Sequence, residues 1–201
     1  MTRIIGGAAG GRRLQTSRGS TTRPTSDRVR EALFSTIESW CGSLSGLRFL
    51  DLYAGSGAVG LEAWSRGAGV VTLVESDRRA ASLIRDNART VGARTAAEVV
   101  GSSVSTTLRR VPRAPYDVVF LDPPYPMSVG EVDQALSDLD GQGWLVPGAM
   151  VVVERSARTD APSFPDGFTD VRERRYGETT LWYGHAAPSA AARPAAPVPE
   201  E

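Results

Sequence analysis

Three glycines and one acidic residue have the spacing of a nucleotide-binding loop. Gly55, Gly57 and Gly60 form a G-x-G-x-x-G pattern directly after an apolar run, and Glu75 lies twenty residues beyond Gly55. Glycines in this pattern let a ligand approach the N-terminus of the following helix, and an acid at this distance accepts hydrogen bonds from ribose hydroxyls. The pattern therefore predicts a site for an adenosine-containing cofactor, and NAD fits it as well as any other.

A carboxylate just before this loop narrows the choice of cofactor. Asp51 begins the run Asp51-Leu52-Tyr53-Ala54-Gly55-Ser56-Gly57. A carboxylate at this position can meet an amino-acid ammonium group, which NAD lacks. Asp51 therefore favours a cofactor that carries an amino acid.

A second polar motif, Asp122-Pro123-Pro124-Tyr125, follows the apolar segment 118–121. The two prolines fix an extended turn and have no N–H, so their carbonyls are left to accept hydrogen bonds. Asp122 and a proline carbonyl can hold an exocyclic amino group with its lone pair aimed at an electrophile, while the Tyr125 ring stacks on a planar base. The motif therefore predicts chemistry on an amine of a nucleobase.

The elements that must position these motifs alternate between short apolar strands and amphipathic helices. Their pattern predicts an α/β, Rossmann-like, mostly parallel twisted sheet of seven strands with helices on both faces. The carboxyl ends of parallel strands share one edge, so Asp122 and the glycine loop are expected to face one pocket. Strands are expected at 48–53, 70–75, 97–101, 117–121 and 150–154, helices at 59–66, 78–91, 104–110 and 129–140, and a closing antiparallel hairpin at 169–175 and 179–183.

The N-terminal part of the chain is basic. Residues 1–48 hold eight Arg against three acidic residues, whereas residues 49–154 hold nine Arg against thirteen. Residues 1–22 are expected to form a small β-hairpin extension. A helix is expected to begin at Thr25 or Ser26, with Val29, Leu33, Ile37 and Trp40 on its buried stripe and Arg28 and Arg30 on its outer face.

Composition excludes several classes of protein. The 201 residues are 41% hydrophobic and 23% charged, as in ordinary globular chains, so fibrous and wholly disordered classes are excluded. Neither a membrane span nor a signal peptide is predicted, which favours a cytoplasmic protein. One Cys and one His are too few for a zinc site, so no metal is expected.

The chain is expected to have one main domain, formed by residues 23–185. The Ala- and Pro-rich residues 186–201 are expected to form a disordered tail.

Together these motifs resemble the class I S-adenosylmethionine-dependent methyltransferases that modify exocyclic amino groups. The R-I-I-G-G of residues 3–7, the R-P-T-S-D-R-V-R-E-A-L-F of residues 23–34 and the glycine loop resemble more narrowly the RsmD family. That resemblance implies transfer of a methyl group from S-adenosyl-L-methionine to N2 of a guanine in 16S rRNA. It also implies 16S rRNA, within the assembling 30S subunit, as the partner. A monomer is expected by default.

The resemblance assigns roles to particular residues. The residues implied to act on the base are Asp122, Pro123, Pro124 and Tyr125. Those implied to bind the cofactor are Asp51, Tyr53, Gly55, Ser56, Gly57, Glu75, Ser76, Ser102 and Ser103, where Ser102 and Ser103 stand in place of an Asp that such enzymes often carry. Those expected to bind RNA phosphates are Arg3, Arg12, Arg13, Arg23, Thr25, Arg28 and Arg30.

Other functions share parts of this pattern. A DNA adenine-N6 methyltransferase has both motifs but usually needs a target-recognition domain, and a protein glutamine-N5 methyltransferase typically has Asn in place of Asp122. A nicotinamide-dependent oxidoreductase would leave residues 122–125 without a role. An RNA-binding module with an inactive methyltransferase fold would bind RNA without turnover.

Overall fold

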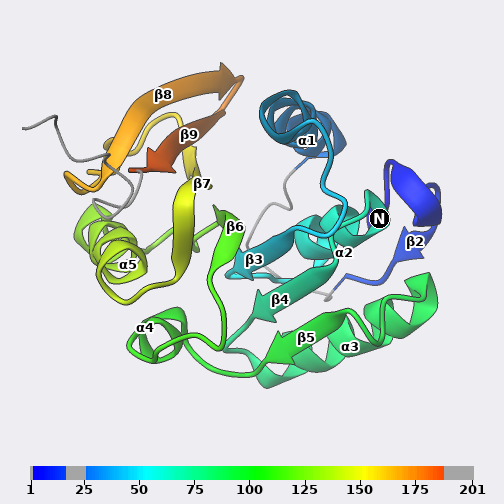
Figure 1. The fold of residues 1–201 in the computed structure, drawn as a ribbon. Coiled ribbons are helices and arrows are strands. Elements are labelled where there is room, and N and C mark those ends of the chain that lie inside the picture. Colours follow the sequence, from blue (N-terminus) through cyan, green and yellow to red (C-terminus); the bar gives the residue numbers. More distant parts are fainter. Residues whose placement is uncertain (1, 17–25, 188–201) are drawn as a thin grey trace, which may run out of the picture.

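The computed structural model describes residues 2–16 and 26–187, and its largest element is a seven-stranded sheet. The sheet has the order β5-β4-β3-β6-β7-β9-β8, and β9 runs in the direction opposite to the other six strands (Figure 1). The predicted α/β class and mostly parallel sheet are confirmed. The strands are β3 (Arg48–Leu52), β4 (Val70–Val74), β5 (Ala97–Val100), β6 (Tyr116–Leu121), β7 (Leu145–Ser156), β8 (Phe168–Tyr176) and β9 (Thr179–Ala186).

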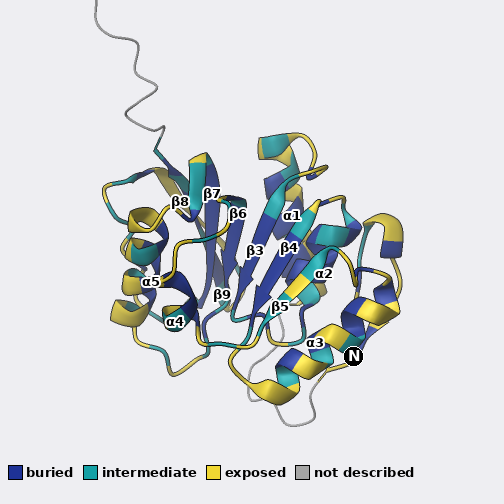
Figure 2. Ribbon diagram, turned by 60° about the horizontal axis from the view of Figure 1, so that its bottom comes forward, coloured by how far each residue is buried: buried dark blue, intermediate teal, exposed yellow. Residues whose placement is uncertain are grey.

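Helices cover both faces of the sheet (Figure 2). They are α1 (Asp27–Cys41), α2 (Ala58–Ser65), α3 (Arg78–Val91), α4 (Val104–Leu108) and α5 (Val129–Gly141). Phe49 of β3 points to the face covered by α1, α2 and α3, while Leu50 and Leu52 point to the face covered by α4 and α5. All three side chains are fully buried, and each contributes roughly 1.5–3 kcal/mol of hydrophobic stabilisation.

Helix α1 begins where the sequence predicts. The Ser26 side chain accepts a hydrogen bond from the Val29 N–H at 3.2 Å, which satisfies one of the free amides of the first turn. Val29, Leu33 and Ile37 are buried as expected. Trp40, predicted to be buried, is 38% exposed and lies beside the His185 ring at the end of the helix.

The N-terminal hairpin packs against the main sheet domain. Its strands β1 (Thr2–Arg3) and β2 (Arg13–Leu14) pair antiparallel as predicted, and a short 3-10 helix, η1 (Gly7–Ala9), lies between them. Ile4, Ala9 and Leu14 form a buried cluster with residues of α2 and α3. The predicted boundary at residue 22 lies outside the described residues, as do residues 188–201 of the tail expected to be disordered from residue 186. Ala186 itself is the last residue of β9 and is 7% exposed, so the start of that tail was placed too early.

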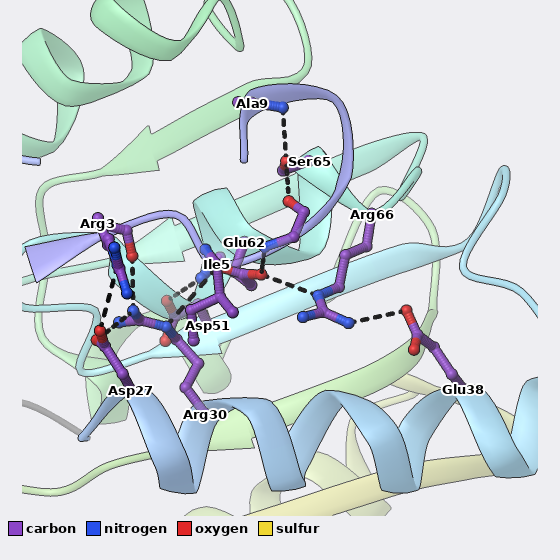
Figure 3. A network of polar contacts seen from close by, with 12 residues as sticks. Arg3, Ile5, Ala9, Asp27, Arg30, Glu38, Asp51, Glu62, Ser65 and Arg66 are labelled. Atoms are coloured by element: carbon purple, nitrogen blue, oxygen red, sulfur yellow. Dashed lines mark hydrogen bonds and ion pairs between the residues drawn. The ribbon is translucent and has the colours of Figure 1, made fainter. Parts of the chain in front are cut away.

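A buried polar network joins this hairpin to α1 and α2 (Figure 3). Glu62 of α2 is fully buried, and its carboxylate accepts hydrogen bonds from the Ile5 and Gly6 N–H groups at 2.7 and 2.8 Å. It also accepts one from Arg66 Nε at 2.9 Å. A buried carboxylate needs partners of this kind, so the network fixes the hairpin on α2.

The expected position of Arg30 on the outer face of α1 is wrong. Its side chain is fully buried, and it donates hydrogen bonds to the Arg3 carbonyl at 2.6 Å and to the Asp27 carboxylate at 2.9 Å. Its Nε lies 3.8 Å from the Glu62 carboxylate. Burial lowers the pKa of the Arg30 guanidinium, while the charges of Glu62 and Asp27 oppose that change. Arg30 therefore belongs to the internal network and does not present its charge to a phosphate.

Candidate active site

The carboxyl ends of four parallel strands form one row. Leu52, Val74, Val100 and Leu121 are in register across β3, β4, β5 and β6. The predicted site residues follow directly after these positions in the chain. The sheet therefore brings the glycine loop, the end of β4, the Ser102-Ser103 turn and the proline turn to one edge, as predicted.

The glycine loop has the conformation that its residues require. Gly55 and Gly57 have φ angles of +57° and +80°, a region that favours glycine, and Gly57 caps the N-terminus of α2. A Cβ at Gly60 would lie 2.7 Å from Leu73 Cδ2, so the third glycine lets α2 pack closely on β4. At Gly55 a Cβ would meet no atom of the described chain within 4 Å, so this part of the loop is open to a ligand.

Glu75 links the loop to the end of β4. Its carboxylate accepts hydrogen bonds from the Gly55 N–H at 2.9 Å and from the Asp77 N–H at 2.8 Å. A carboxylate has about four acceptor positions, so ribose hydroxyls can still bind it. Ser76, the next residue, is exposed at the same edge.

Asp51 lies beneath the loop. The side chain is buried, and its Oδ2 accepts a hydrogen bond from the Gly60 N–H at 2.8 Å. Burial raises the pKa of Asp51 to about 7; the bond from Gly60 opposes this shift, and the charge of Glu75 adds to it. Asp51 therefore fixes the start of α2, a role that the sequence did not indicate.

Tyr53 has an uncommon backbone conformation for a residue other than glycine. Its φ angle is +63°, directly after β3. Such conformations cost of order 1–3 kcal/mol and are concentrated at functional sites. Burial raises the pKa of its hydroxyl to about 12, with the charge of Glu131 adding to the shift and that of Arg155 opposing it.

Strand β5 is followed by a serine that caps helix α4. Ser103 accepts a hydrogen bond from the Thr106 N–H at 3.1 Å and so caps α4. Ser102 is half-buried beside it. Both serines lie at the same edge of the sheet as the glycine loop, and the Ser103 hydroxyl also has this local structural role.

The proline turn is held on both sides. The Asp122 N–H donates to the Leu52 carbonyl at 3.4 Å, and the Pro124 carbonyl accepts from the Met127 N–H at 2.9 Å. Arg155 of β7 donates from Nη2 to the Met127 carbonyl at 2.9 Å. The Pro124 carbonyl is thus occupied within the turn, whereas the structure gives the Pro123 carbonyl no donor among the described residues.

A pocket of about 150 Å³ opens beside this turn. Tyr125, at its rim, is 69% exposed, so its ring is accessible. Sequence reasoning missed most of the other lining residues, and it expected the glycine loop to share this pocket with Asp122, whereas no residue of the loop lines it. The lining residues are Asp122, Pro123 and Tyr125 of the turn, Ser26 and Val29 of α1, Glu154, Arg155 and Ser156 of β7, Thr159, and Tyr176, Glu178 and Thr179 around the β8–β9 turn.

The predicted RNA-binding residues divide into three groups. Arg3, Arg12, Arg13 and Arg28 are exposed, whereas Arg30 is buried. Arg12 also donates to the Thr90 carbonyl at 2.9 Å, so part of its binding capacity is used within the chain. Arg23 and Thr25 lie outside the described residues.

Among residues 2–16 and 26–187, no helix has both the length and the apolar character to cross a membrane. In that part of the chain, no group of three or more His, Cys, Asp or Glu side chains could hold a metal ion.

The sheet order, the glycine loop with Glu75 and the proline turn at one edge define a class I S-adenosylmethionine-dependent methyltransferase. Residues 2–185 match the sequence family described as "Conserved hypothetical protein 95". The chain belongs to this family, and the resemblance to the RsmD family is confirmed.

Similar proteins support both the methyltransferase class and the family. "Ribosomal RNA small subunit methyltransferase D" of Escherichia coli (strain K12) is 36% identical over 176 residues, which are 88% of this chain and 85% of that protein. A solved structure, "Putative methyltransferase yhhF from Escherichia coli", is 33% identical with a TM-score of 0.80, over 92% of this chain and 98% of that one. An RNA methyltransferase from Salinibacter ruber, solved with S-adenosyl-L-homocysteine, shares the fold at 19% identity and a TM-score of 0.60, over 89% and 98%.

Proposed function

We propose that the protein transfers a methyl group from S-adenosyl-L-methionine to the exocyclic N2 of a guanine in 16S rRNA of the small ribosomal subunit. The observation that carries this proposal is the pocket beside Asp122 and Pro123, at the edge of the sheet that also carries the open glycine loop. The name of the E. coli relative supports ribosomal RNA of the small subunit as the substrate. The position of the modified guanine in that RNA is left to the experiment.

The residues around the loop fit this cofactor. Gly55 offers open backbone, Glu75 offers carboxylate oxygens to the ribose hydroxyls, and Asp51 has a carboxyl group beneath the loop that can accept a hydrogen bond from the ammonium group. Tyr53, Ser56, Gly57, Ser76, Ser102 and Ser103 complete the proposed binding set. When bound, the cofactor supplies an electrophilic methyl group on a positively charged sulfur.

The proline turn orients the amine. The Asp122 carboxylate and the Pro123 carbonyl accept hydrogen bonds from the two N–H groups of the guanine amine, which aims its nitrogen at the methyl group. A guanine amine is a weak nucleophile because its lone pair is delocalised, so this orientation and polarisation supply much of the catalysis. Pro124 fixes the turn through its bond from Met127.

The base must leave its stack to enter the pocket. Extrusion costs a few kcal/mol, and stacking on the Tyr125 ring returns roughly 1–3 kcal/mol. The exposed side chains of Arg3, Arg12, Arg13 and Arg28 would bind phosphates of the RNA, with Arg23 and Thr25 added as predictions from sequence. We propose further that the enzyme acts as a monomer in the cytoplasm, on 16S rRNA within the assembling 30S subunit.

Methyl transfer to small ribosomal subunits that lack the modification tests this function. Label from S-adenosyl-L-methionine is expected in N2-methylguanosine after nucleoside digestion. Asp122→Ala should lower the rate at least about 100-fold and leave cofactor affinity within about twofold, because Asp122 orients the amine rather than the cofactor. Asp160→Ala, at an exposed position, is the matched control and should retain full activity.

Other results would support the other functions. Label in N6-methyladenosine of DNA or in a protein glutamine would replace the proposal with one of those substrates. RNA binding without transfer by the unaltered protein would indicate an inactive methyltransferase fold.

A further inference from the structure

Glu154 is a buried acidic residue in the pocket to which the proposed function gives no role. It lies near the end of β7, lines the pocket and is 8% exposed. Its carboxylate lines the same pocket as Asp122 and has several acceptor positions, so it can accept a hydrogen bond from a base that enters this pocket.

The register of the sheet places Glu154 beside Asp122. Leu121 of β6 pairs with Val153 of β7 in parallel; Glu154 is the next residue of β7, and Asp122 follows directly after the end of β6. Phe120 and Val152, two residues earlier, both pack on the face covered by α1. Asp122 and Glu154 both line the pocket together with Val29 of α1, which agrees with side-chain alternation that continues one residue past β6.

Two neighbouring carboxylates offer only acceptors when they are ionised. The edge of a base that fits them must therefore present two adjacent donors. Guanine does so, with N1–H next to its N2 amino group. Adenine and cytosine instead have a ring nitrogen lone pair next to the amino group, which a carboxylate would repel.

We propose that Glu154 is the residue that selects guanine: its carboxylate accepts a hydrogen bond from N1–H while Asp122 holds the N2 amino group. This inference rests on the proposed function and adds the determinant of base specificity. A flipped base is commonly read on this edge, so recognition and methyl transfer occur in the same pocket.

Glu178 is the matched comparison within the same pocket. It also lines the pocket, but its side chain is 64% exposed and its carboxylate lies 3.0 Å from Arg158. It belongs to the turn between β8 and β9 rather than to the row of strand ends. Glu178→Gln therefore makes the same chemical change without altering the proposed hydrogen bond to N1–H.

The first measurement changes the substrate and leaves the protein unaltered. The probe is a synthetic fragment of small-subunit rRNA, assembled with small-subunit proteins, that carries guanine or 2-aminopurine at the labelled position. 2-Aminopurine keeps the N2 amino group but has a lone pair at N1 in place of N1–H. The loss of a hydrogen bond to a charged group predicts a kcat/KM about 10- to 100-fold lower for 2-aminopurine.

The second measurement changes the protein. Glu154→Gln should lower kcat/KM on guanine about 10-fold and raise it on 2-aminopurine, because the glutamine amide can donate to the N1 lone pair. Such a change in base preference would not follow from a purely structural role. Glu178→Gln should keep the preference of the unaltered protein. Melting temperature and cofactor affinity are measured on each variant.

The results separate this inference from the proposed function. Equal rates on guanine and 2-aminopurine with the unaltered protein would overturn the role of Glu154, whether or not Glu154→Gln folds. The role of Glu154 would also be overturned if the Glu154→Gln variant preferred guanine over 2-aminopurine as strongly as the unaltered protein does. In both cases label in N2-methylguanosine would still support the proposed function. Label in N6-methyladenosine, or none in RNA, would overturn both.

Discussion

At the scale of single residues, the Asp51 carboxyl group both accepts a structural hydrogen bond and has a raised pKa. Its carboxylate holds the Gly60 amide in a buried position, and burial raises its pKa to about 7. In the unfolded chain an aspartate loses its proton near pH 4. The folded protein therefore binds a proton at Asp51 that the unfolded chain has already released, and ionised Asp51 disfavours folding increasingly from about pH 4 to about pH 7.

Replacing this carboxyl with an amide should remove that dependence on pH. Asp51→Asn keeps an oxygen that can accept from the Gly60 N–H but cannot ionise. Relative to the unaltered protein, its free energy of unfolding should rise between about pH 4 and 7 by an amount on the order of a few kcal/mol, then stay constant. Urea unfolding of both proteins from pH 4 to 8 measures the difference. A difference that is independent of pH would contradict the titration of Asp51.

At the scale of elements, α3 connects the N-terminal hairpin to the glycine loop through Asn87. This side chain is buried, and its amide group donates to the carbonyls of Gln15 and Ser56, each at 2.9 Å. Its oxygen accepts from the Gln15 N–H at 2.8 Å. The Asn87 side chain therefore holds both Gln15, just after β2, and Ser56 of the glycine loop.

Asn87→Ala should weaken both connections. Leaving buried backbone groups without partners costs about 1–3 kcal/mol of stability, and a looser glycine loop should raise the dissociation constant of S-adenosyl-L-methionine about 10-fold. Calorimetric titration and thermal unfolding measure the two effects. Thr90→Ala, an exposed change one turn further along α3, is the control. Cofactor affinity equal to that of the unaltered protein would show that the loop holds its shape without Asn87.

The elements were predictable because local patterns determine them. Apolar periodicity gave helix α3 with its observed ends, and the strands of the row to within a few residues. Strand β7 begins five residues earlier than expected, at Leu145, since its first part carries a Pro and a Gly and lacks a continuous apolar run. Arg30 was misplaced although it is four residues before buried Phe34; its acidic partner Glu62 comes from another helix, which local periodicity cannot reveal.

The candidate site was predictable where its residues lie in compact motifs. The glycine loop, Glu75 and the proline turn each follow a strand, so topology alone places them at one edge. Glu154 and Tyr176 come from separate strands and become neighbours of Asp122 only in the folded sheet. Glu154 did have a signal, because it ends a predicted parallel strand at the same edge.

At the scale of the whole molecule, charge is distributed unevenly along a chain with no net charge. The first 48 residues carry the excess of arginine, and the network around Glu62 anchors their hairpin to the main domain (Figure 3). Anchoring matters for RNA binding, because a fixed set of guanidinium groups loses less conformational entropy on binding than a free arm. The exposed arginines of this region are therefore expected to bind RNA as a rigid surface.

The salt dependence of RNA binding tests this surface. The combined variant Arg3→Ala, Arg13→Ala and Arg28→Ala should weaken binding and reduce the slope of log Kd against log salt by about 0.7–0.9 for each phosphate that no longer pairs with an arginine, hence by about two. The control replaces the exposed Arg109, Arg110 and Arg113, which precede β6 at the opposite edge of the sheet. Both variants remove three positive charges. Equal slopes for the two would contradict a binding surface at the N-terminal hairpin and α1, because net charge alone would then determine the affinity.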